Sequence, residues 1–497
     1  MAKPRMKSPY STNEAIKKLA TNNCSVTFRQ YPYQLLNGIL GILFPLITYP
    51  YLTRVLGPER LGAIHFVDYA VGLIYGITSL GIPAYGVYRI AQLQATGLSK
   101  RQSYTPMMRM HTLLGAIGFG IFYILFADHE NWNYVMPLFP LGACYLIANS
   151  LASDWYLQGR QHFKTIAIRN LIFRGLGLVF IFLWVKSPSD YSIYYWIIVI
   201  SVIATAIYNL AWIRRDLKNE AALPVSSSID RKEMFLFFIA TVFISITDYL
   251  DATLLGLLSN ETEVCFYTNA AKLVRLSLLV TLALNAVVFP QFSGIQAQQQ
   301  PTRSVELLRK SVDWLIFLTI PISVLYLLFG KELVLVFSGP AFTNSISSVY
   351  WMAPIPLFIS LSNLLLYYGL SSRPELQKRI AVGVAVGILI SIGLNSWLIP
   401  LYGAKGAAMN SFLTELGFLI FFLLLIKPTI PVETMLKAGA TALIFIPVSM
   451  GMEATSWTNL TKLLVGGFSC LMLYGLIQHY IWKHPFLQEG LEMIRKK

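Results

Sequence analysis

The clearest structural signal in this chain is LLNGILGILFPLITYPYLTRVLGPERLGAIHFVDYAVGLIYGITSLGI, residues 35–82. Two apolar runs, 35–50 and 63–82, flank the polar stretch YLTRVLGPERLG at 51–62. A helix needs about 20 mostly apolar residues to cross the hydrocarbon core of a bilayer. The segment therefore predicts two membrane-spanning helices joined by a short turn at Gly57-Pro58.

The composition of the whole chain is that of a membrane protein. Hydrophobic residues make up 55% of the 497 positions and charged residues 13%, about half the share of charge in globular proteins. The net charge of +15 does not indicate nucleic-acid binding, because the charges lie in short clusters between apolar runs. The four cysteines have neither metal-ligand nor disulfide spacing. The N-terminal region lacks the apolar core of a signal peptide, and the chain has no ATPase P-loop pattern.

The same length criterion predicts fourteen spans along the chain. Their ranges are 34–53, 61–83, 107–127, 134–152, 168–185, 191–212, 234–258, 273–293, 312–329, 346–369, 380–399, 406–426, 433–452 and 460–482. The predicted fold class is an all-α polytopic membrane protein. The turns between the spans are too short to hold a folded domain outside the bilayer.

The distribution of Lys and Arg orients these spans. Cytoplasmic loops of membrane proteins carry an excess of both residues. If the N-terminus is cytoplasmic, most of the 39 Lys and Arg residues fall in segments on the cytoplasmic side, and the opposite turns hold few of them. The pattern predicts that both termini are cytoplasmic.

An internal repeat divides the chain into two halves. TRVLGPERLGAIHFVDYAVGLI (53–74) aligns with ATLLGLLSNETEVCFYTNAAKLVRL (252–276), which places Asp68 over Asn269 and Val71 over Lys272. Six spans separate the two starts, so both halves enter the membrane from the same side, as in transporters that rock two lobes about a central site. We expect a cytoplasmic N-terminal segment (1–33), a lobe of spans 1–6 (34–220), a lobe of spans 7–12 (221–426), and spans 13–14 with a cytoplasmic tail (427–497).

Four segments, spread from the first span to the twelfth, resemble one transporter family. They are FPLITYPYLTRVLGPERLGAIHF (44–66), SDWYLQGRQHFKTIAIRN (153–170), ITDYLDATLLG (246–256) and NSWLIPLYGAKGAAMNSFLTEL (395–416). Together they resemble the Wzx-type flippases of O-antigen and other polysaccharide repeat units. That family belongs to the multidrug/oligosaccharidyl-lipid/polysaccharide exporter superfamily.

The resemblance implies a fold and a function. The fold would be two six-helix lobes that face each other in a V and work by alternating access. The substrate would be an undecaprenyl-diphosphate-linked oligosaccharide, moved from the cytoplasmic to the outer face of the bacterial inner membrane for lipopolysaccharide or other surface polysaccharide synthesis. Polysaccharide polymerase and chain-length proteins would be partners. No cofactor is expected, and an H⁺ or Na⁺ gradient or consumption of the product would supply the energy.

Two pairs of intramembrane charges are the main candidates for a site. Lys272 and Arg275 lie on one face of span eight, and Asp248 and Asp251 repeat that spacing on span seven. Charges inside a span are costly and are functional candidates by default. One interpretation is that the four residues only form interhelical ion pairs. The other interpretation, favoured by the resemblance, is that the two cations bind a diphosphate. The two carboxylates would then tune the cations or take a proton.

Five further charged residues are weaker candidates. Asp68 and Glu415 are buried carboxylates that could couple transport to an ion gradient, although Glu415 could instead bond a neighbouring polar side chain. Arg54 closes span one on the outer side and is a candidate gate or substrate-binding residue. Arg89 and Arg174 are either positive-inside anchors or contacts for an incoming substrate headgroup. In the first turn, Arg60 is expected to be solvated beside Glu59, and His65 to lie at a shallow depth.

Two other function classes stay open. A drug or cation antiporter of the same superfamily would need an anionic central cavity. A membrane polymerase or ligase acting on lipid-linked sugars would need catalytic groups in a sizeable outer loop, and the predicted outer turns are short. The sequence therefore favours a transporter over an enzyme.

Overall fold

A computed structural model describes residues 13–96, 99–126, 134–218, 231–278, 301–372, 374–429 and 431–484, with a few isolated positions between 281 and 295 and residue 488. Every long element in these residues is a helix. The α-helices are α1 (Asn13–Thr78), α2 (Ile82–Thr96), α3 (Arg101–Phe126), α4 (Phe139–Ala152), α5 (Asp154–Gly159), α6 (Phe163–Trp184), α7 (Tyr191–Lys218), α8 (Arg231–Leu258), α9 (Glu261–Leu276), α11 (Pro301–Phe337), α12 (Ser345–Met352), α13 (Ile355–Ser372), α14 (Gln377–Ile426), α15 (Val432–Ala442), α16 (Phe445–Glu453), α17 (Asn459–Thr461) and α18 (Gly467–Tyr480).

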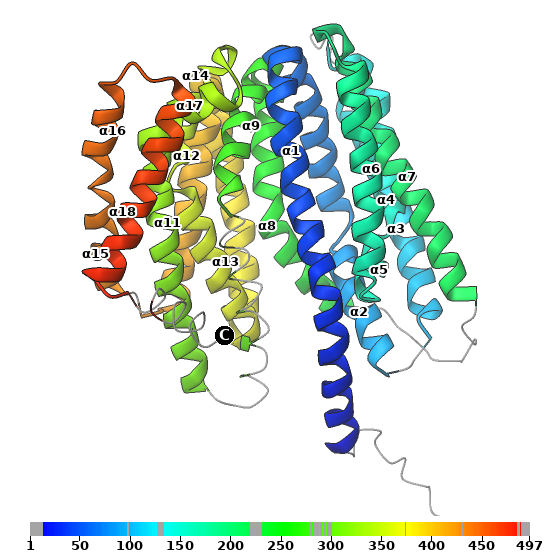
Figure 1. The fold of residues 1–497 in the computed structure, drawn as a ribbon. Helices are drawn as coiled ribbons and strands as arrows, with labels where there is room; N and C mark the ends of the chain where they lie inside the picture. The colour runs from blue at the N-terminus through cyan, green and yellow to red at the C-terminus, as the bar shows by residue number, and fades with distance from the viewer. Residues whose placement is uncertain are drawn as a thin grey trace, which may run out of the picture.

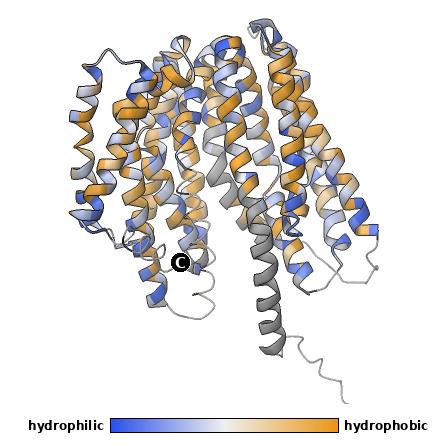
Figure 2. Ribbon diagram, viewed as in Figure 1, coloured by the Kyte–Doolittle hydropathy of each residue, from blue (hydrophilic) through white to orange (hydrophobic). Residues whose placement is uncertain are grey.

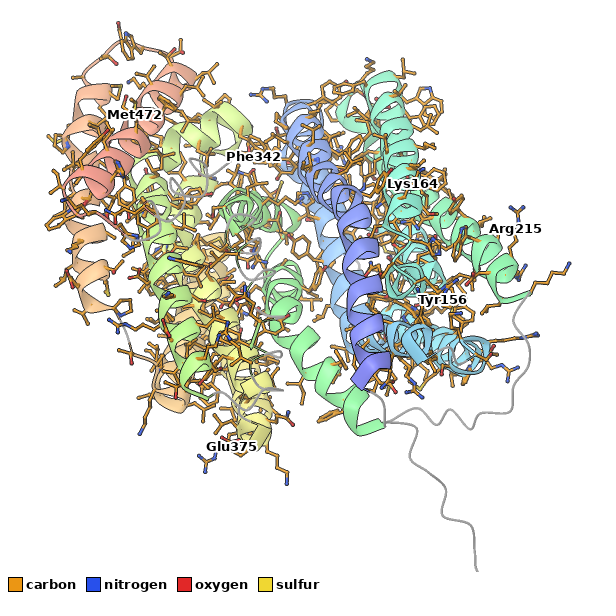
Figure 3. All side chains as sticks on the ribbon, turned by 60° about the horizontal axis from the view of Figure 1, so that its bottom comes forward. Tyr156, Lys164, Arg215, Phe342, Glu375 and Met472 are labelled. Atoms are coloured by element: carbon orange, nitrogen blue, oxygen red, sulfur yellow. The ribbon has the colours of Figure 1, made fainter. Side chains whose placement is uncertain are left out.

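The helices form two bundles that meet along α1 (Figure 1). Helices α1–α7 form one bundle, and the helices from α8 onward form the other. The second half of α1 packs against α8 and α9, and α2 also contacts α8. Figure 3, in which the lower end of Figure 1 comes forward, shows Tyr156 on one bundle and Glu375 on the other. The predicted lobe boundary at residue 220 falls outside the described residues, and all four domain limits stay predictions.

The described residues contain nine helices that are long and apolar enough to cross a membrane, and the bent pair α12–α13 makes a tenth. Two of the nine, Leu36–Thr78 and Gln377–Ile426, each cover two of the predicted spans. The backbone leaves the helical region inside each of them, at Gly57 and at Gly403. The chain is thus a multi-pass helical membrane protein, and the number of fourteen spans remains a prediction.

Hydrophobic residues occur along most of the helices of both bundles (Figure 2), and many large apolar side chains among them are exposed. Ile124, Phe468 and Leu424 are 78%, 70% and 69% exposed, values that a soluble protein could not tolerate over so many residues. In a bilayer the same side chains face hydrocarbon, while the helices satisfy their own backbone groups.

Gly57 and Gly403 turn their helices back on themselves. The ring of Tyr49 stacks on His65 across Gly57, and Gly383 and Gly387 meet Phe421 and Phe418 across Gly403, so each helix is an antiparallel hairpin. Both glycines have positive φ angles, 71° and 55°, which side chains with a Cβ atom rarely adopt.

Gly403 has a second reason to be glycine. A Cβ atom there would lie 2.5 Å from Oε2 of Glu263. That oxygen accepts a hydrogen bond from the backbone N–H of Ala404 at 2.6 Å, which satisfies a donor at the start of the returning helix. The Gly403 turn is therefore built around a carboxylate from α9.

Two glycines let the bundles approach closely on one side of α1. A Cβ atom on Gly62 would lie 1.9 Å from the carbonyl oxygen of Glu261, and one on Gly256 would lie 2.0 Å from the Phe66 ring. Small residues permit such close helix contacts in membranes. Leu56, Phe66 and Val264 belong to one buried apolar cluster that joins the two bundles.

The prediction that span eight begins at residue 273 is wrong. Helix α9 begins at Glu261, because the side chain of Asn260 caps it by accepting the N–H of Glu263 at 3.0 Å. Glu261 and Glu263 in the first turn also favour a helix start, since carboxylates complement the helix dipole. Lys272 and Arg275 consequently lie about 16 and 21 Å from the start of α9, near its C-terminal end, instead of at the start of a span.

The 153–170 segment folds into a polar brace inside the first bundle. Ser153 has φ 48° and separates α4 from α5. The buried guanidinium of Arg169 bonds Asp154 at 2.6 Å and Asn209 at 2.5 Å, and thereby ties α5, α6 and α7 together. This brace shares no residue with the cavity described next.

Candidate functional site

A cavity of about 410 Å³ lies at the junction of the two bundles. One wall is α1 between Gly41 and Tyr49, with Tyr194 of α7 beside it. The opposite wall carries Lys272 and Arg275 of α9 and the end of α11. The structure thus brings the two candidate cations of the sequence together at one cavity between the bundles.

Lys272 is held in place by an aromatic and an imidazole from the other bundle. Its Nζ atom lies 2.5 Å from Nε2 of His65 and 4.7 Å from the centre of the Tyr49 ring. The rings of His65 and Tyr49 are stacked, 5.9 Å apart and 10° from parallel. An ammonium group over an aromatic face is stabilised electrostatically, so Tyr49 supports the charged form of Lys272.

The hydrogen bonds determine which nitrogen of His65 carries a proton. The hydroxyl of Thr268 donates to the carbonyl of Val264 at 2.8 Å, so its oxygen is free to accept. Nδ1 of His65 lies 2.7 Å from that oxygen and is therefore the donor. Nε2 is left as an acceptor for Lys272. The remaining N–H groups of the Lys272 ammonium are available to a ligand in the cavity.

Arg275 has different neighbours from Lys272. It lies within electrostatic range of Tyr69 on α1 and of Glu415 on α14. Glu415 is 9% exposed and also lies near Asp251. The two cations of the cavity are thus coupled to different carboxylates, Arg275 to Glu415 and Lys272 to Asp68.

Asp251 does not pair with either cation, contrary to the ion-pair interpretation. Its carboxylate is 2% exposed and accepts four hydrogen bonds from neutral groups. The donors are Asn395 at 2.7 Å, Asn410 at 2.9 Å, Ser411 at 2.6 Å and Tyr267 at 3.1 Å. The side chain of Asp248 lies outside those that the structure describes.

Asp68 lies on the side of α1 that faces its own bundle. Its Oδ1 atom is buried and has no hydrogen bond among the described residues, although Tyr195 and Lys272 are near enough to act on its charge. Its repeat partner Asn269 instead accepts a hydrogen bond from Ser338 at 2.6 Å. The two equivalent positions therefore have different environments.

Arg54 bridges the bundles outside the cavity. Its guanidinium donates to the carbonyls of Val336 at 2.7 Å and Phe337 at 3.3 Å, at the C-terminus of α11. Cations are favoured at this position because the helix dipole is negative there and the last carbonyls lack partners. Arg54 thus joins the first bundle to the second, and its role as a gate residue stays a prediction.

The other two candidate arginines lie apart from the two cavity cations. Arg89 on α2 donates to Gln92 at 2.5 Å, one turn farther along the same helix. Arg174 on α6 packs against α1, where a Cβ atom on Gly41 would lie 3.6 Å from its Nη1 atom. Because Gly41 lines the cavity, Arg174 borders it, whereas Arg89 does not.

The prediction that Arg60 is solvated beside Glu59 is wrong. Its guanidinium lies over the ring of Tyr134, 3.3 Å from the centre, with Tyr191 at 5.4 Å. Aromatic residues from two other helix ends therefore hold it, because a cation over an aromatic face gains energy that plain solvation does not supply.

Tyr49 and Thr268 are site residues that the sequence did not single out, and His65, expected at a shallow depth, is instead buried beside Lys272. His65 lies three residues before Asp68, a spacing that places both on one face of a helix, and this was the available signal. No local pattern connects His65 to Lys272, which lies more than 200 residues away in the chain.

Comparisons with known proteins agree on one family and one fold. A family model described as "Polysaccharide biosynthesis protein" matches residues 30–296, more than half of the chain. A "Putative O-antigen transporter" of Shigella dysenteriae is 23% identical over 393 residues, which cover 78% of this chain and 96% of the relative. A protein of the same name from Escherichia coli (strain K12) is 25% identical and covers 75% and 90%.

A solved structure supports the fold independently. The lipid II flippase MurJ in an inward closed conformation matches with a TM-score of 0.62 at 14% identity, over 91% of this chain and 99% of that one. At this identity the likeness concerns the arrangement of helices alone.

Proposed function

The chain belongs to the polysaccharide biosynthesis protein family, and from this premise we propose that it is a flippase for lipid-linked oligosaccharides. The substrate is an undecaprenyl-diphosphate-linked repeat unit for O-antigen or a related surface polysaccharide. The protein works in the bacterial inner membrane with both termini cytoplasmic, and it delivers its product to polysaccharide polymerase and chain-length proteins.

The observation that carries this proposal is the pair of cations at the junction of the bundles. Lys272 and Arg275 line one cavity, and a diphosphate offers several charged oxygens to such donors. The planar guanidinium can donate two parallel hydrogen bonds, while the ammonium adds a point charge that His65 and Tyr49 orient. The apolar lipid tail can stay in the bilayer while the headgroup crosses.

Alternating access follows from the way the bundles are joined. Arg54 and the close contact at Gly62 join them on the predicted outer side of the cavity. Opening that side requires the Arg54 hydrogen bonds to break and α1 to separate from α9. The binding energy of the diphosphate in the cavity between the bundles is available to favour one state over the other.

Reconstitution tests the function directly. Proteoliposomes containing the full chain and undecaprenyl diphosphate linked to a labelled oligosaccharide should move the label to the opposite leaflet, where an added glycosidase can release it. Liposomes without protein measure spontaneous movement, which is slow because sugars and phosphates do not cross hydrocarbon. An equal rate with and without protein would refute the proposal.

A cation antiporter fits the site less well. A cationic drug would meet Lys272 and Arg275 in the cavity, and like charges repel. The carboxylate Asp251 is enclosed by neutral donors and does not line that cavity. The same superfamily fold therefore carries a cavity of the opposite sign from the one that a cationic drug needs.

We further propose that Asp251 couples transport to an ion gradient, together with Glu415 and Asp68, which lie within electrostatic range of Arg275 and Lys272 respectively. Among the described residues the hydrogen bonds to the buried carboxylate of Asp251 all come from neutral donors, so a proton or a sodium ion can neutralise its charge without breaking an ion pair with any of them. The four donors come from α9 and both halves of α14, so a change of charge at Asp251 acts on three helix segments at once.

Replacing Asp251 by asparagine is expected to abolish the stimulation of transport by an imposed H⁺ or Na⁺ gradient, because the amide cannot change its charge. The measurement compares initial rates of translocation in proteoliposomes with and without each gradient. Glu306→Gln, an exposed carboxylate on α11, is the matched control and should keep the stimulation. A gradient effect of the same size in Asp251→Asn would show that Asp251 is not the coupling group.

A further inference from the structure

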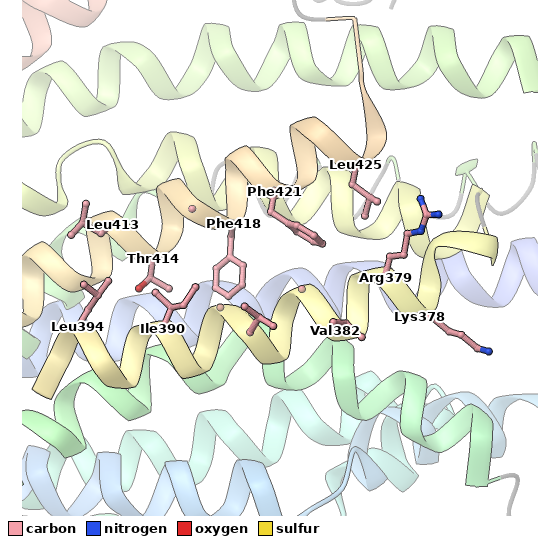
Figure 4. Close-up of a pocket in the computed structure, with 14 residues that line it drawn as sticks. Lys378, Arg379, Val382, Ile390, Leu394, Leu413, Thr414, Phe418, Phe421 and Leu425 are labelled. Atoms are coloured by element: carbon pink, nitrogen blue, oxygen red, sulfur yellow. The ribbon is translucent and has the colours of Figure 1, made fainter.

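A second cavity, of about 690 Å³, lies along the hairpin of α14 (Figure 4). It runs between the two halves of the hairpin, from Lys378 and Arg379 at one end to Leu394 and Leu413 at the other. We call it the hairpin groove. It shares no lining residue with the cavity between the bundles.

The walls of the hairpin groove are apolar and shaped by glycines. Gly383 and Gly387 leave room for the rings of Phe421 and Phe418, which a Cβ atom would approach to 2.1 and 2.4 Å. A Cβ atom on Gly417 would meet nothing within 4 Å, so the space there is open. The hairpin groove is thus a concave apolar surface on helices that stand in the membrane.

The length of the hairpin groove matches a lipid chain. Lys378 and Leu394 are separated by about 24 Å along the helix, against about 30 Å for the hydrocarbon core of a bilayer. A chain in the groove would therefore begin at one membrane interface and end beyond the midplane. A gap between two neighbouring helices suits a single chain better than the paired chains of a phospholipid.

The charged end of the hairpin groove matches a phosphate headgroup. Lys378 and Arg379 are exposed there, and no carboxylate is among the described residues that line the groove. Glu375 precedes them in the chain but lies outside the lining. An ammonium and a guanidinium at the same end of the groove can each donate hydrogen bonds to a phosphate of a diphosphate.

The far end of the hairpin groove is adjacent in the chain to a residue that acts on the cavity between the bundles. Thr414 lines the groove, and the next residue, Glu415, lies within electrostatic range of Arg275. Arg275 is one of the two cations of the cavity. A lipid in the groove therefore contacts Thr414, and the next residue, Glu415, acts electrostatically on Arg275 of the proposed diphosphate site.

We propose that the hairpin groove binds the isoprenoid chain of the lipid-linked substrate, with its diphosphate at Lys378 and Arg379, before the headgroup moves into the cavity between the bundles. This proposal rests on the flippase function proposed above. It adds a second cationic position, at the membrane surface, to the one formed by Lys272 and Arg275.

Photolabelling of the full chain in lipid nanodiscs tests the hairpin groove without transport. The probe is a polyprenyl diphosphate with a diazirine in its isoprenoid chain, and mass spectrometry maps the labelled peptides. We expect labels within 378–394 and 413–425. Replacing Lys378 and Arg379 by glutamine should lower that labelling by about ten-fold, because two charge-assisted hydrogen bonds are lost at an exposed position.

Gly417→Leu is a second variant that fills the hairpin groove without a backbone clash, and it should lower labelling to a similar extent. Gly393→Leu is the matched control, since Gly393 lies on the same helix, has open space around its Cβ position and does not line the groove. Labelling that phosphatidylglycerol displaces as well as undecaprenyl diphosphate would make the groove a general phospholipid site and overturn the proposal. Labels found elsewhere in the chain with none in the groove would also overturn it.

The two proposals can fail separately. Groove labelling by a protein that does not move the oligosaccharide would refute the flippase function and leave the polyprenyl diphosphate site in place. Translocation at the wild-type rate by both groove variants, with no labels in the groove, would refute the groove and leave the flippase function standing.

Discussion

Replacing Lys272 and Arg275 together by alanine is expected to reduce translocation of the lipid-linked oligosaccharide by at least about 100-fold, since each hydrogen bond to a charged group contributes about 1.5–3 kcal/mol. Both side chains line the cavity between the bundles, so the substituted cavity would offer no cation from α9 to a diphosphate. The measurement is the initial rate of translocation in proteoliposomes with equal amounts of folded protein.

The controls separate loss of charge from loss of fold. Lys186→Ala with Lys331→Ala removes two exposed cations and should leave the rate unchanged. Lys272→Arg keeps a cation near His65 and Tyr49 and should retain a substantial part of the rate. A double alanine variant that transports at more than half the wild-type rate would remove Lys272 and Arg275 from the mechanism.

Replacing Gly62 by leucine is expected to keep the bundles apart on the predicted outer side and to stop transport. The added Cβ atom would lie 1.9 Å from the carbonyl oxygen of Glu261 and 3.2 Å from Cβ of Cys265. Overpacking of this kind costs about 1–3 kcal/mol, which corresponds to a shift of about five-fold to more than 100-fold toward the separated state. Because the bundles must close again on that side in every cycle, translocation should fail.

Cys265 reports this opening directly, because it is buried opposite Gly62. In a chain whose other three cysteines are replaced by alanine, a membrane-impermeant thiol reagent should label Cys265 about ten-fold faster in Gly62→Leu than in the parent. Gly467→Leu, which meets no neighbour, is the matched control. Arg54→Ala should act in the same direction with a smaller effect. Unchanged labelling in Gly62→Leu would show that this contact does not close the outer side.

Much of the fold follows from local sequence signals. Runs of about 20 apolar residues mark the spans at 191–212 and 406–426, because each span must satisfy its own backbone hydrogen bonds in the bilayer. The start of α9 was missed for a physical reason. Its first turns are polar, and the cap at Asn260 was a better signal there than hydropathy.

The candidate site was predictable only in part. Lys272 and Arg275 stand out because charge inside a span is rare, and this rule needs no knowledge of neighbours. The hydrogen-bond partners of Asp251 were not predictable in the same way. Its spacing from Asp248 suggested ion pairs with the next span, whereas its partners Asn395 and Ser411 lie about 150 residues farther along the chain.

The sequence by itself determined that the chain crosses the membrane repeatedly, that it turns at Gly57, and that two cations lie at or inside the edge of one span. These are local properties, set by the transfer of each residue from water to hydrocarbon and by the backbone freedom of glycine. Only the tertiary structure decided the partners of each charge. His65 reaches Lys272 and Arg54 reaches α11 because the bundles dock along α1, and docking depends on side-chain shape at close contacts such as Gly62 with Glu261.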